Sequence, residues 1–325
     1  MNQHVLVTGG TGFIGYYIVK SLVETGYKVT VMARAENPDS PIRQLNDQIN
    51  FVKGDLTDLD SLEAACNGQD IIVHAAALIS FDPAERKKIF KNNIDGTTHL
   101  VNTALKSSVK KLIYISSIAA ISSSPDEQDH DESIPWDLKS NHSNYALSKH
   151  AAEMEVWRGS AEGLEVGILN PSVVLGRWED HHHSMQLFNM MRRGILFYPE
   201  GSTGWVDVRD VAKAVVAFIE SGIINQQFII NGHNESYQDI LQMIATAIGK
   251  KGPRYLLPRS IALTATRLYA LLNKIASGKR VIQASVIKSL YKEVTYNNAK
   301  SISQLGLAYT SLRDTIEWVV NNKAE

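Results

Sequence analysis

Short apolar runs alternate with longer amphipathic stretches over the first two thirds of the chain. The short runs are rich in β-branched residues and predict buried strands at 5–7 (beginning near residue 4), 28–33, 49–53, 70–74, 111–115, 165–169 and 226–230. The stretches between them place apolar residues three and four apart, which predicts helices at 13–24, 59–66, 83–107, 145–160 and 210–221. Strands that alternate with helices in this rhythm form a parallel, doubly wound α/β sheet.

The pattern changes after the sixth predicted strand. Residues 170–206 indicate loops around one helix near 185–193, and the chain from residue 236 onward is predicted to be mostly helical. The polar, Pro-containing segment 122–144 is predicted as a loop. We therefore expect a dinucleotide-binding domain at 1–169, to which 206–231 returns, and a smaller, mostly helical substrate lobe at 170–205 and 232–325.

Composition narrows the function classes. The chain has 325 residues, 44% of them hydrophobic, and a formal net charge of −1, so no global basic field favours nucleic acid. The single cysteine, Cys66, excludes an internal disulfide and fits a reducing compartment. The first strand leaves no room for a signal peptide, and no apolar run reaches the ~18 residues that a membrane helix needs. We expect a cytoplasmic protein without an integral membrane segment.

The residues after the first strand carry the clearest functional signal. The segment TGGTGFIG places Gly9, Gly12 and Gly15 between a buried strand and an amphipathic helix. Glycines let the backbone approach a ligand, and the first turn of a helix offers free N–H groups and a positive dipole end to a pyrophosphate. The spacing differs from the usual G-x-G-x-x-G, and a plain turn with glycines for packing is the alternative. We predict a dinucleotide-binding turn.

The end of the second strand indicates which dinucleotide would bind. A carboxylate there would accept the ribose hydroxyls of NAD and repel a 2′-phosphate. Here Ala33 holds the position, followed by Arg34, and Arg43 comes later in the chain. These residues favour NADP over NAD, with a solvated surface arginine as the alternative. Asp55, after the third strand, would either bond the adenine amino group or cap a turn.

Ser117, Tyr145 and Lys149 are the candidate catalytic residues. Tyr and Lys four residues apart lie on one face of a helix. A phenol with an ordinary pKa near ~10 is a poor acid at neutral pH, so we expect the Lys149 ammonium to lower the pKa of Tyr145. Tyr145 would then exchange a proton with a carbonyl oxygen to which Ser117 also bonds, and Lys149 would hold the nicotinamide ribose.

The spacing Tyr-x-x-x-Lys is not specific by itself, because it occurs three times in the chain. The pairs Tyr16/Lys20 and Tyr296/Lys300 also match. Only Tyr145 begins a helix that follows a central strand ending in serines. Ligands of doubly wound sheets bind beyond the carboxyl ends of the strands, where those serines fall.

A set of ordered motifs extends this picture over nearly the whole chain: TGGTGFIG, GDLTD, HAAA, NNIDGT, YISS, YALSK, NPSVVLG and VDVRDVA. In this order they resemble the extended short-chain dehydrogenases/reductases, and most closely the dihydroflavonol-4-reductase-like branch. The resemblance implies a Rossmann fold, a nicotinamide cofactor, and Ser117, Tyr145 and Lys149 as a catalytic triad. It also implies that Asn93 supports the site, and it suggests a homodimer by analogy.

The resemblance further implies positions along the cofactor. Phe13 and Ile14 would lie by the pyrophosphate, and Pro171 and Val173 would pack near the nicotinamide carboxamide. The complete set of predicted cofactor contacts is Gly9, Thr11, Gly12, Phe13, Ile14, Gly15, Arg34, Arg43, Asp55, Leu56, Ala75, Ala76, Ala77, Asn93, Tyr145, Lys149, Pro171 and Val173.

One departure from the superfamily bears on the substrate. Nucleotide-sugar epimerases carry an arginine shortly before the strand that here reads WVDV, and this chain has GSTG there. This favours an uncharged carbonyl or alcohol compound. We expect an NADP-dependent oxidoreductase that reduces a ketone or aldehyde, or oxidises the alcohol. The alternatives are a nucleotide-sugar epimerase or dehydratase, a 3β-hydroxysteroid-type dehydrogenase, and a non-catalytic NADP-sensing protein.

Two further features need an interpretation. The run from His181 to His183 invites a metal, but adjacent side chains point in different directions, so we predict no metal site. Lysines and arginines recur among apolar residues from 254 to 292. They fit the solvated faces of helices, with a peripheral membrane contact as the alternative.

Overall fold

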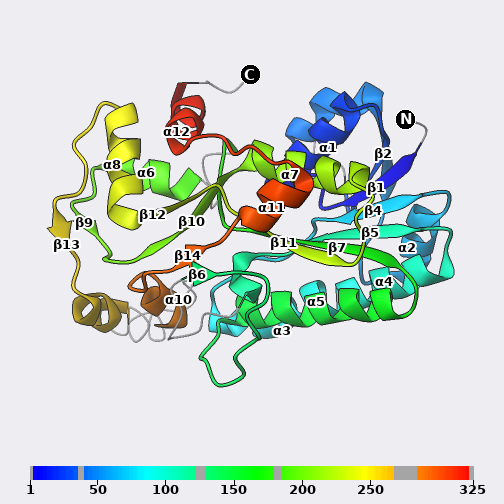
Figure 1. The fold of residues 1–325 in the computed structure, drawn as a ribbon, viewed down its shortest axis with the longest axis horizontal. Helices are drawn as coiled ribbons and strands as arrows, with labels where there is room; N and C mark the ends of the chain where they lie inside the picture. Colours follow the sequence, from blue (N-terminus) through cyan, green and yellow to red (C-terminus); the bar gives the residue numbers. More distant parts are fainter. Residues whose placement is uncertain (1–2, 36–39, 122–128, 179–184, 267–283, 322–325) are drawn as a thin grey trace.

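The computed structural model describes residues 3–35, 40–121, 129–178, 185–266 and 284–321, and its centre is a parallel sheet of seven strands (Figure 1). Their spatial order is β11-β7-β5-β4-β1-β2-β3. The bounds are β1 His4–Thr8, β2 Lys28–Ala33, β3 Ile49–Lys53, β4 Ile71–His74, β5 Lys111–Ile115, β7 Glu165–Pro171 and β11 Gln226–Ile230. The direction of winding reverses between β1 and β4. The predicted doubly wound α/β fold is therefore confirmed.

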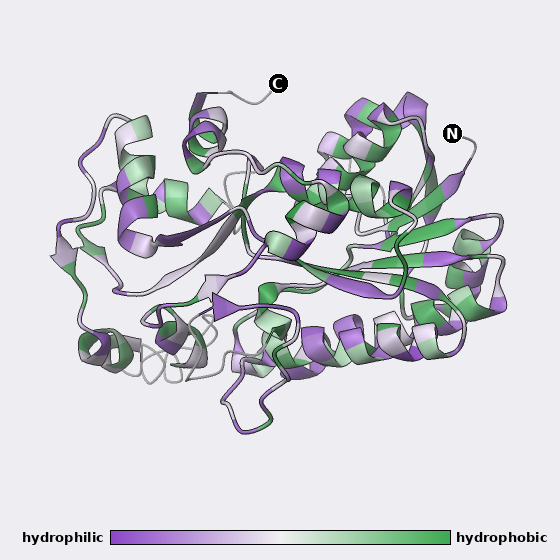
Figure 2. Cartoon of the chain, viewed as in Figure 1, coloured by the Kyte–Doolittle hydropathy of each residue, from purple (hydrophilic) through white to green (hydrophobic). Residues whose placement is uncertain are grey.

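Helices cover both faces of this sheet (Figure 1). One face carries α1 (Phe13–Glu24) and α7 (Val208–Glu220), and the other carries α2 (Leu59–Cys66), α4 (Gly96–Lys106) and α5 (Asn144–Ala161). Alternate side chains of a strand point to opposite faces. Val5 and Val7 therefore belong to the core under α1 and α7, while Leu6 belongs to the core under α2, α4 and α5. Figure 2 shows the resulting hydrophobic strands between helices with polar outer faces.

The single helix predicted across 83–107 is interrupted in the structure. A 3-10 turn (Pro83–Glu85) leads into α3 (Arg86–Phe90), and a π-helical turn (Lys91–Asp95) separates α3 from α4. A π turn inserts one residue into the helical repeat and often marks a functional position. Periodicity of apolar residues does not reveal such an insertion, because the flanking turns keep the helical spacing.

The segment predicted as loops around one helix contains three strands as well. The predicted helix is α6 (Gln186–Arg193), and the strands are β8 (Val173–Leu175), β9 (Phe197–Tyr198) and β10 (Ser202–Asp207). β10 pairs in parallel with β8 and antiparallel with β12 (His233–Ser236). These strands form a second sheet that begins where β7 and β11 leave the first one.

The remainder of the described chain is mainly helical, as predicted, with short strands that the prediction missed. The helices with both ends described are α8 (Tyr237–Ala247), α10 (Ala284–Ser289), α11 (Ala299–Leu305) and α12 (Leu312–Asn321), and residues 259–266 are helical as well. β13 (Tyr255–Leu256) pairs with β9, and β14 (Thr295–Tyr296) pairs with β6 (Asp129–His130). β6 lies inside the segment 122–144 that was predicted as a loop. No helix among the described residues has the length and hydrophobicity needed to cross a membrane.

A separate hydrophobic core holds α6, α8, α12 and β10 together. Phe188, Trp205, Ile240 and Ile316 are buried in it. In Figure 1 this part of the molecule lies at the left, beyond the carboxyl ends of the parallel strands. The region where a doubly wound sheet binds its ligands therefore faces this second group of elements.

Candidate active site

The turn after β1 and the first turn of α1 each have a position that admits only glycine. Gly9 has a φ of +74°, and a Cβ atom there would lie 2.5 Å from the amide nitrogen of Ala76. A Cβ atom at Gly15 would collide with the carbonyl group of Gly9. Gly12, at the start of α1, provides no side-chain cap, so the N–H groups of the first turn are left for a ligand. This backbone suits an anionic group such as a pyrophosphate.

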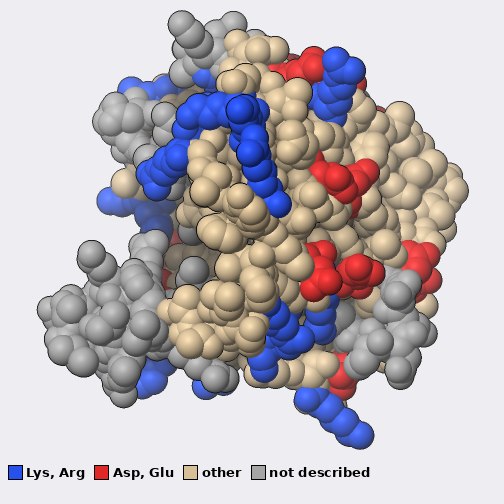
Figure 3. All heavy atoms as spheres, turned by 90° about the vertical axis from the view of Figure 1, so that its left-hand side faces the viewer, with Lys and Arg blue, Asp and Glu red and all other residues tan. Residues whose placement is uncertain are grey.

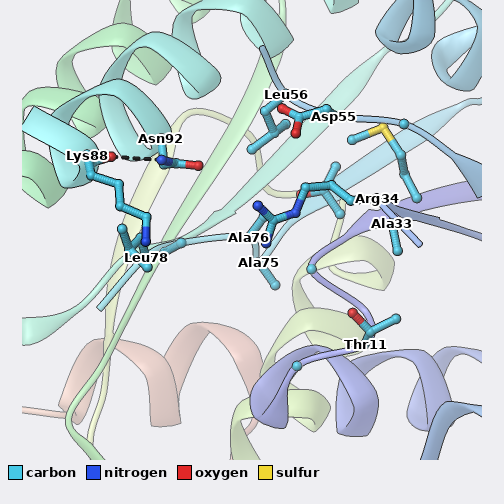
Figure 4. A pocket seen from close by; sticks show the side chains of 16 residues that line it. Thr11, Ala33, Arg34, Asp55, Leu56, Ala75, Ala76, Leu78, Lys88 and Asn92 are labelled. Atoms are coloured by element: carbon cyan, nitrogen blue, oxygen red, sulfur yellow. Dashed lines mark hydrogen bonds between the residues drawn. The ribbon is translucent and has the colours of Figure 1, made fainter. Parts of the chain in front are cut away.

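A cavity of about 370 Å³ opens beside this turn (Figure 4). Its walls come from the carboxyl ends of β1, β2, β3 and β4 and from α3 with the π turn that follows it. The lining residues are Thr8, Gly9, Thr11, Gly12, Met32, Ala33, Arg34, Gly54, Asp55, Leu56, Ala75, Ala76, Ala77, Leu78, Lys88 and Asn92. Nine of them were predicted as cofactor contacts, namely Gly9, Thr11, Gly12, Arg34, Asp55, Leu56, Ala75, Ala76 and Ala77.

The predicted contacts at the start of α1 lie next to the cavity rather than in its wall. The Phe13 ring is buried against Tyr17 and Trp178, with ring centroids 6.0 and 5.8 Å apart. Ile14 packs on the core beneath α1. Only the backbone of this first turn, and not the Phe13 side chain, is therefore placed to meet a ligand.

Four further predictions fall elsewhere. Arg43 is exposed on a 3-10 helix (Pro41–Gln48) that the sequence did not predict, and it does not line the cavity. Pro171 ends β7, and Val173 begins β8 with an exposed side chain. The run from His181 to His183 lies outside the described residues.

Arg34 brings positive charge into the cavity from the end of β2 (Figure 4). Near it, Asp55 Oδ1 accepts hydrogen bonds from the Thr57 amide and hydroxyl, both at 2.8 Å. The hydrogen bond from the Thr57 amide is the main cause that lowers the pKa of Asp55, and the charge of Arg34 adds a smaller effect. Asp55 thus stabilises a turn, one of its two predicted roles, and also lines the cavity.

Lys88 and Asn92 are lining residues that the sequence analysis missed. They extend into the cavity from α3 and the π turn, on the side away from Arg34 (Figure 4). The Asn92 amide donates to the Lys88 carbonyl oxygen at 2.8 Å. The signal that could have found them is their spacing, because residues four apart share one face of a helix.

Ser117 and Tyr145 come together although 28 positions separate them in the chain. Ser117 is the second residue after β5, and its hydroxyl accepts a hydrogen bond from the Ala119 amide at 3.1 Å. Tyr145 lies in the first turn of α5, which Ser143 caps by accepting the Ala146 amide. Burial raises the pKa of Tyr145 to about 12, and the neighbouring Ser117 side chain opposes that rise. The phenol therefore holds its proton at neutral pH.

Lys149 lies one turn further along α5 and is almost fully buried, with 1% of its surface exposed. Its amine donates to the Ile115 carbonyl oxygen at 2.7 Å, which ties α5 to the end of β5. Burial lowers the pKa of Lys149 to about 7, against the opposing charge of Glu153. The expectation that Lys149 lowers the pKa of Tyr145 is therefore wrong for this structure. Burial disfavours the charged form of both groups, so it lowers the pKa of the Lys149 amine and raises that of the Tyr145 phenol.

A buried polar network behind Lys149 was also missed. Glu153, with 2% exposed surface, accepts a 2.6 Å hydrogen bond from the Asn170 side-chain amide. The same amide group donates to the Ser117 carbonyl oxygen at 2.9 Å, and Gln227 donates to Asn170 Oδ1 at 3.0 Å. Burial raises the pKa of Glu153 to about 7. Asn170 thus fixes the backbone of Ser117 through a hydrogen bond, and Glu153 fixes the side chain of Asn170.

Asn93, which the family resemblance implies as a support of the site, lies between the chain after β4 and α5. It is buried in the π turn, where its Oδ1 accepts the Leu78 amide at 2.7 Å. Its amide group donates to the Leu78 carbonyl oxygen and to the Ser148 hydroxyl, both at 3.0 Å. Asn93 therefore fixes the chain after β4 to α5, next to the cavity. It does not itself line the cavity wall.

Residues 5–230 match the NAD dependent epimerase/dehydratase family. The chain belongs to this family. Enzymes of the epimerase/dehydratase family bind NAD(P), and the glycine turn and cavity described above fit such a dinucleotide. The resemblance inferred from the ordered motifs is confirmed, and so is the expectation of an enzyme.

Relatives and a solved structure agree with membership of the epimerase/dehydratase family. Cinnamoyl-CoA reductase 1 of Arabidopsis thaliana is 30% identical, over 78% of this chain and 76% of its own length. A protein of Synechocystis sp., provisionally named a dihydroflavonol 4-reductase, is 29% identical over 97% of this chain and 94% of its own. The crystal structure of gox2253 is 28% identical with a TM-score of 0.84, covering 98% of this chain and 97% of that one.

Proposed function

We propose that this protein is an NADP-dependent reductase that converts a ketone or aldehyde to the alcohol, or oxidises the alcohol in the reverse direction. The observation that carries the proposal is that the Tyr145 and Ser117 side chains lie close together beyond the carboxyl end of β5, with Lys149 buried one turn further along α5. Phenol, hydroxyl and amine in this arrangement can bind a carbonyl oxygen and move a proton to it. The reductase names of the curated relatives support the same reaction class.

In the proposed reaction, different residues of this chain would bind the dinucleotide, donate the proton and orient the substrate. Bound NADPH supplies the hydride. The turn from Gly9 to Gly12, Arg34 and Lys149 would hold the dinucleotide. Tyr145 keeps a proton at its hydroxyl oxygen and gives it to the substrate oxygen, to which Ser117 also donates a hydrogen bond. Lys149 sets the distance between these two residues because its amine joins α5 to β5.

The division of the chain belongs to the same proposal. Residues 1–169 and 206–231 would bind the dinucleotide, and residues 170–205 and 232–325 would bind the substrate. The three-stranded sheet of β8, β10 and β12 supports this division, since β8 and β12 follow directly on β7 and β11. A substrate held there would lie across the strand ends from the dinucleotide.

The preference for NADP is tested by replacing Arg34 with aspartate. A hydrogen bond to a charged group contributes about 1.5–3 kcal/mol, so NADPH should bind the Arg34→Asp variant at least about tenfold more weakly, while NADH should not lose affinity. Lys28→Asp is the matched control, because Lys28 is exposed at the other end of β2. Fluorescence titration with both dinucleotides measures the effect. An unchanged preference in Arg34→Asp would remove the argument for NADP.

The reaction class is tested with a substrate panel under NADPH and NADH. The panel contains aldehydes, ketones, sterol-like ketones, a cinnamoyl-CoA thioester, and UDP- and dTDP-sugars. We expect NADPH oxidation with at least one carbonyl compound and none with the nucleotide sugars. Conversion of a nucleotide sugar with NAD would replace the proposal by the epimerase alternative. Tight binding of NADPH without turnover of any panel member would contradict a reductase.

A further inference from the structure

A group of large hydrophobic side chains is exposed at the end of the molecule away from the sheet. Phe197 of β9 and Tyr255 of β13 are paired neighbours, with ring centroids 5.9 Å apart and exposed fractions of 51% and 56%. Leu196 and Leu256 beside them, and Ile261 a little further along, are also exposed. Backbone hydrogen bonds from Arg254 and Tyr255 to the Leu196 carbonyl oxygen join the two segments into one surface.

The same surface is strongly cationic. Residues 185–199 and 240–266 contain no Asp or Glu, and their cations are Arg192, Arg193, Lys250, Lys251, Arg254 and Arg259, all of them exposed. The whole chain, in contrast, has a formal net charge of −1. Figure 3 faces this end of the molecule and shows Lys and Arg gathered on it, with Asp and Glu mainly to one side. We call the exposed part of residues 192–197 and 250–261 the β9–β13 surface.

We propose that the β9–β13 surface docks on an anionic phospholipid bilayer. Basic side chains can contact the charged headgroups of such a membrane, and the exposed aromatic and aliphatic side chains beside them can enter the acyl-chain region beneath. A second copy of the chain is disfavoured as the partner. In a symmetric dimer through this surface, the six cations of one copy would face the six cations of the other and repel them. Nucleic acid would use the charges but leave Leu196, Leu256 and Ile261 exposed. This proposal does not depend on the proposed reduction.

Vesicle binding tests the proposal directly. The full chain should cosediment with vesicles of equimolar phosphatidylcholine and phosphatidylglycerol, and not with phosphatidylcholine alone. Each cation near an anionic membrane contributes about fivefold to partitioning, so Arg193→Glu with Arg254→Glu should reduce binding at least about tenfold. Phe197→Ser with Tyr255→Ser should reduce it as well, because both rings are exposed. High salt should weaken binding of the unmodified chain, since it screens the cations.

Matched variants separate this surface from general charge and hydrophobicity. Lys28→Glu with Lys106→Glu makes the same change of net charge on exposed residues at the far end of the sheet, and Leu59→Ser removes an exposed side chain of α2. Both should bind vesicles like the unmodified chain, and thermal unfolding should show all variants folded. Failure to cosediment, or equal losses in the control variants, overturns the proposal. A dimer that the Arg193/Arg254 variant abolishes in sedimentation analysis also overturns it.

Discussion

Tyr145→Phe is expected to reduce carbonyl turnover by about 10²–10⁴-fold, which is the usual contribution of a positioned proton donor. The substitution removes the hydroxyl next to Ser117 and leaves the ring in contact with Phe81. NADPH affinity and thermal stability should change little. Because the pKa of Tyr145 is raised to about 12, the phenol is protonated throughout the neutral range, and the rate of reduction should not fall there for lack of its proton.

The chain offers a control for this substitution. Tyr16 precedes Lys20 at the same spacing, but it lies on α1, where its hydroxyl donates to Gln44 at 3.2 Å. Tyr16→Phe should therefore retain turnover. The measurement is NADPH oxidation with a substrate identified in the panel, together with fluorescence titration of NADPH. If Tyr145→Phe keeps most of its turnover, or loses no more than Tyr16→Phe, the proposed mechanism is wrong.

Gly15→Ala is expected to destabilise the fold, and Gly12→Ala to weaken dinucleotide binding without doing so. A Cβ atom at Gly15 would lie 2.7 Å from the carbonyl carbon of Gly9 and still closer to its oxygen, and neither backbone atom can rotate away. Overpacking of this kind costs about 1–3 kcal/mol or more, which should lower the melting temperature by several degrees. At Gly12 the nearest atom to such a Cβ would be 3.4 Å away, so the protein itself tolerates alanine.

The two glycine variants together test the role of the turn. Thermal unfolding with and without NADPH, and titration of NADPH by fluorescence, separate stability from binding. Gly12→Ala should unfold like the unmodified protein without ligand, yet gain less stability from NADPH, since its methyl group occupies the space where a phosphate would approach the backbone. Normal NADPH binding by Gly12→Ala would show that the turn does not hold the dinucleotide.

Local signals were sufficient for the parallel sheet and for the glycine turn. A strand buried on both faces must be apolar throughout, and that is how the runs at Val5–Leu6–Val7 and Ile71–Ile72–Val73 appear in the sequence. The turn was recognisable because the glycines stand between such a strand and an amphipathic helix. The π turn at Asn93 was not recognisable from the sequence, because one inserted residue leaves the apolar spacing of the helical turns on either side intact.

The short strands outside the main sheet were missed for a different reason. β9 and β13 have two residues each, and β14 finds its partner β6 more than 160 positions away. Segments of this length have no periodicity to detect, and only the approach of a distant partner makes them strands. The exposed β9–β13 surface likewise became visible only when the two segments were seen hydrogen-bonded side by side.

What the sequence determined by itself is the class of fold, the family, and the identity of the candidate residues, because each depends on side chains close together in the chain or on ordered motifs. The tertiary structure alone decided their electrostatics. Burial raises the pKa of Tyr145 and lowers that of Lys149, and Glu153 and Asn170 join the site from α5 and β7. Desolvation and hydrogen bonding depend on what surrounds a group in space, and the spacing of residues along a chain does not contain that information.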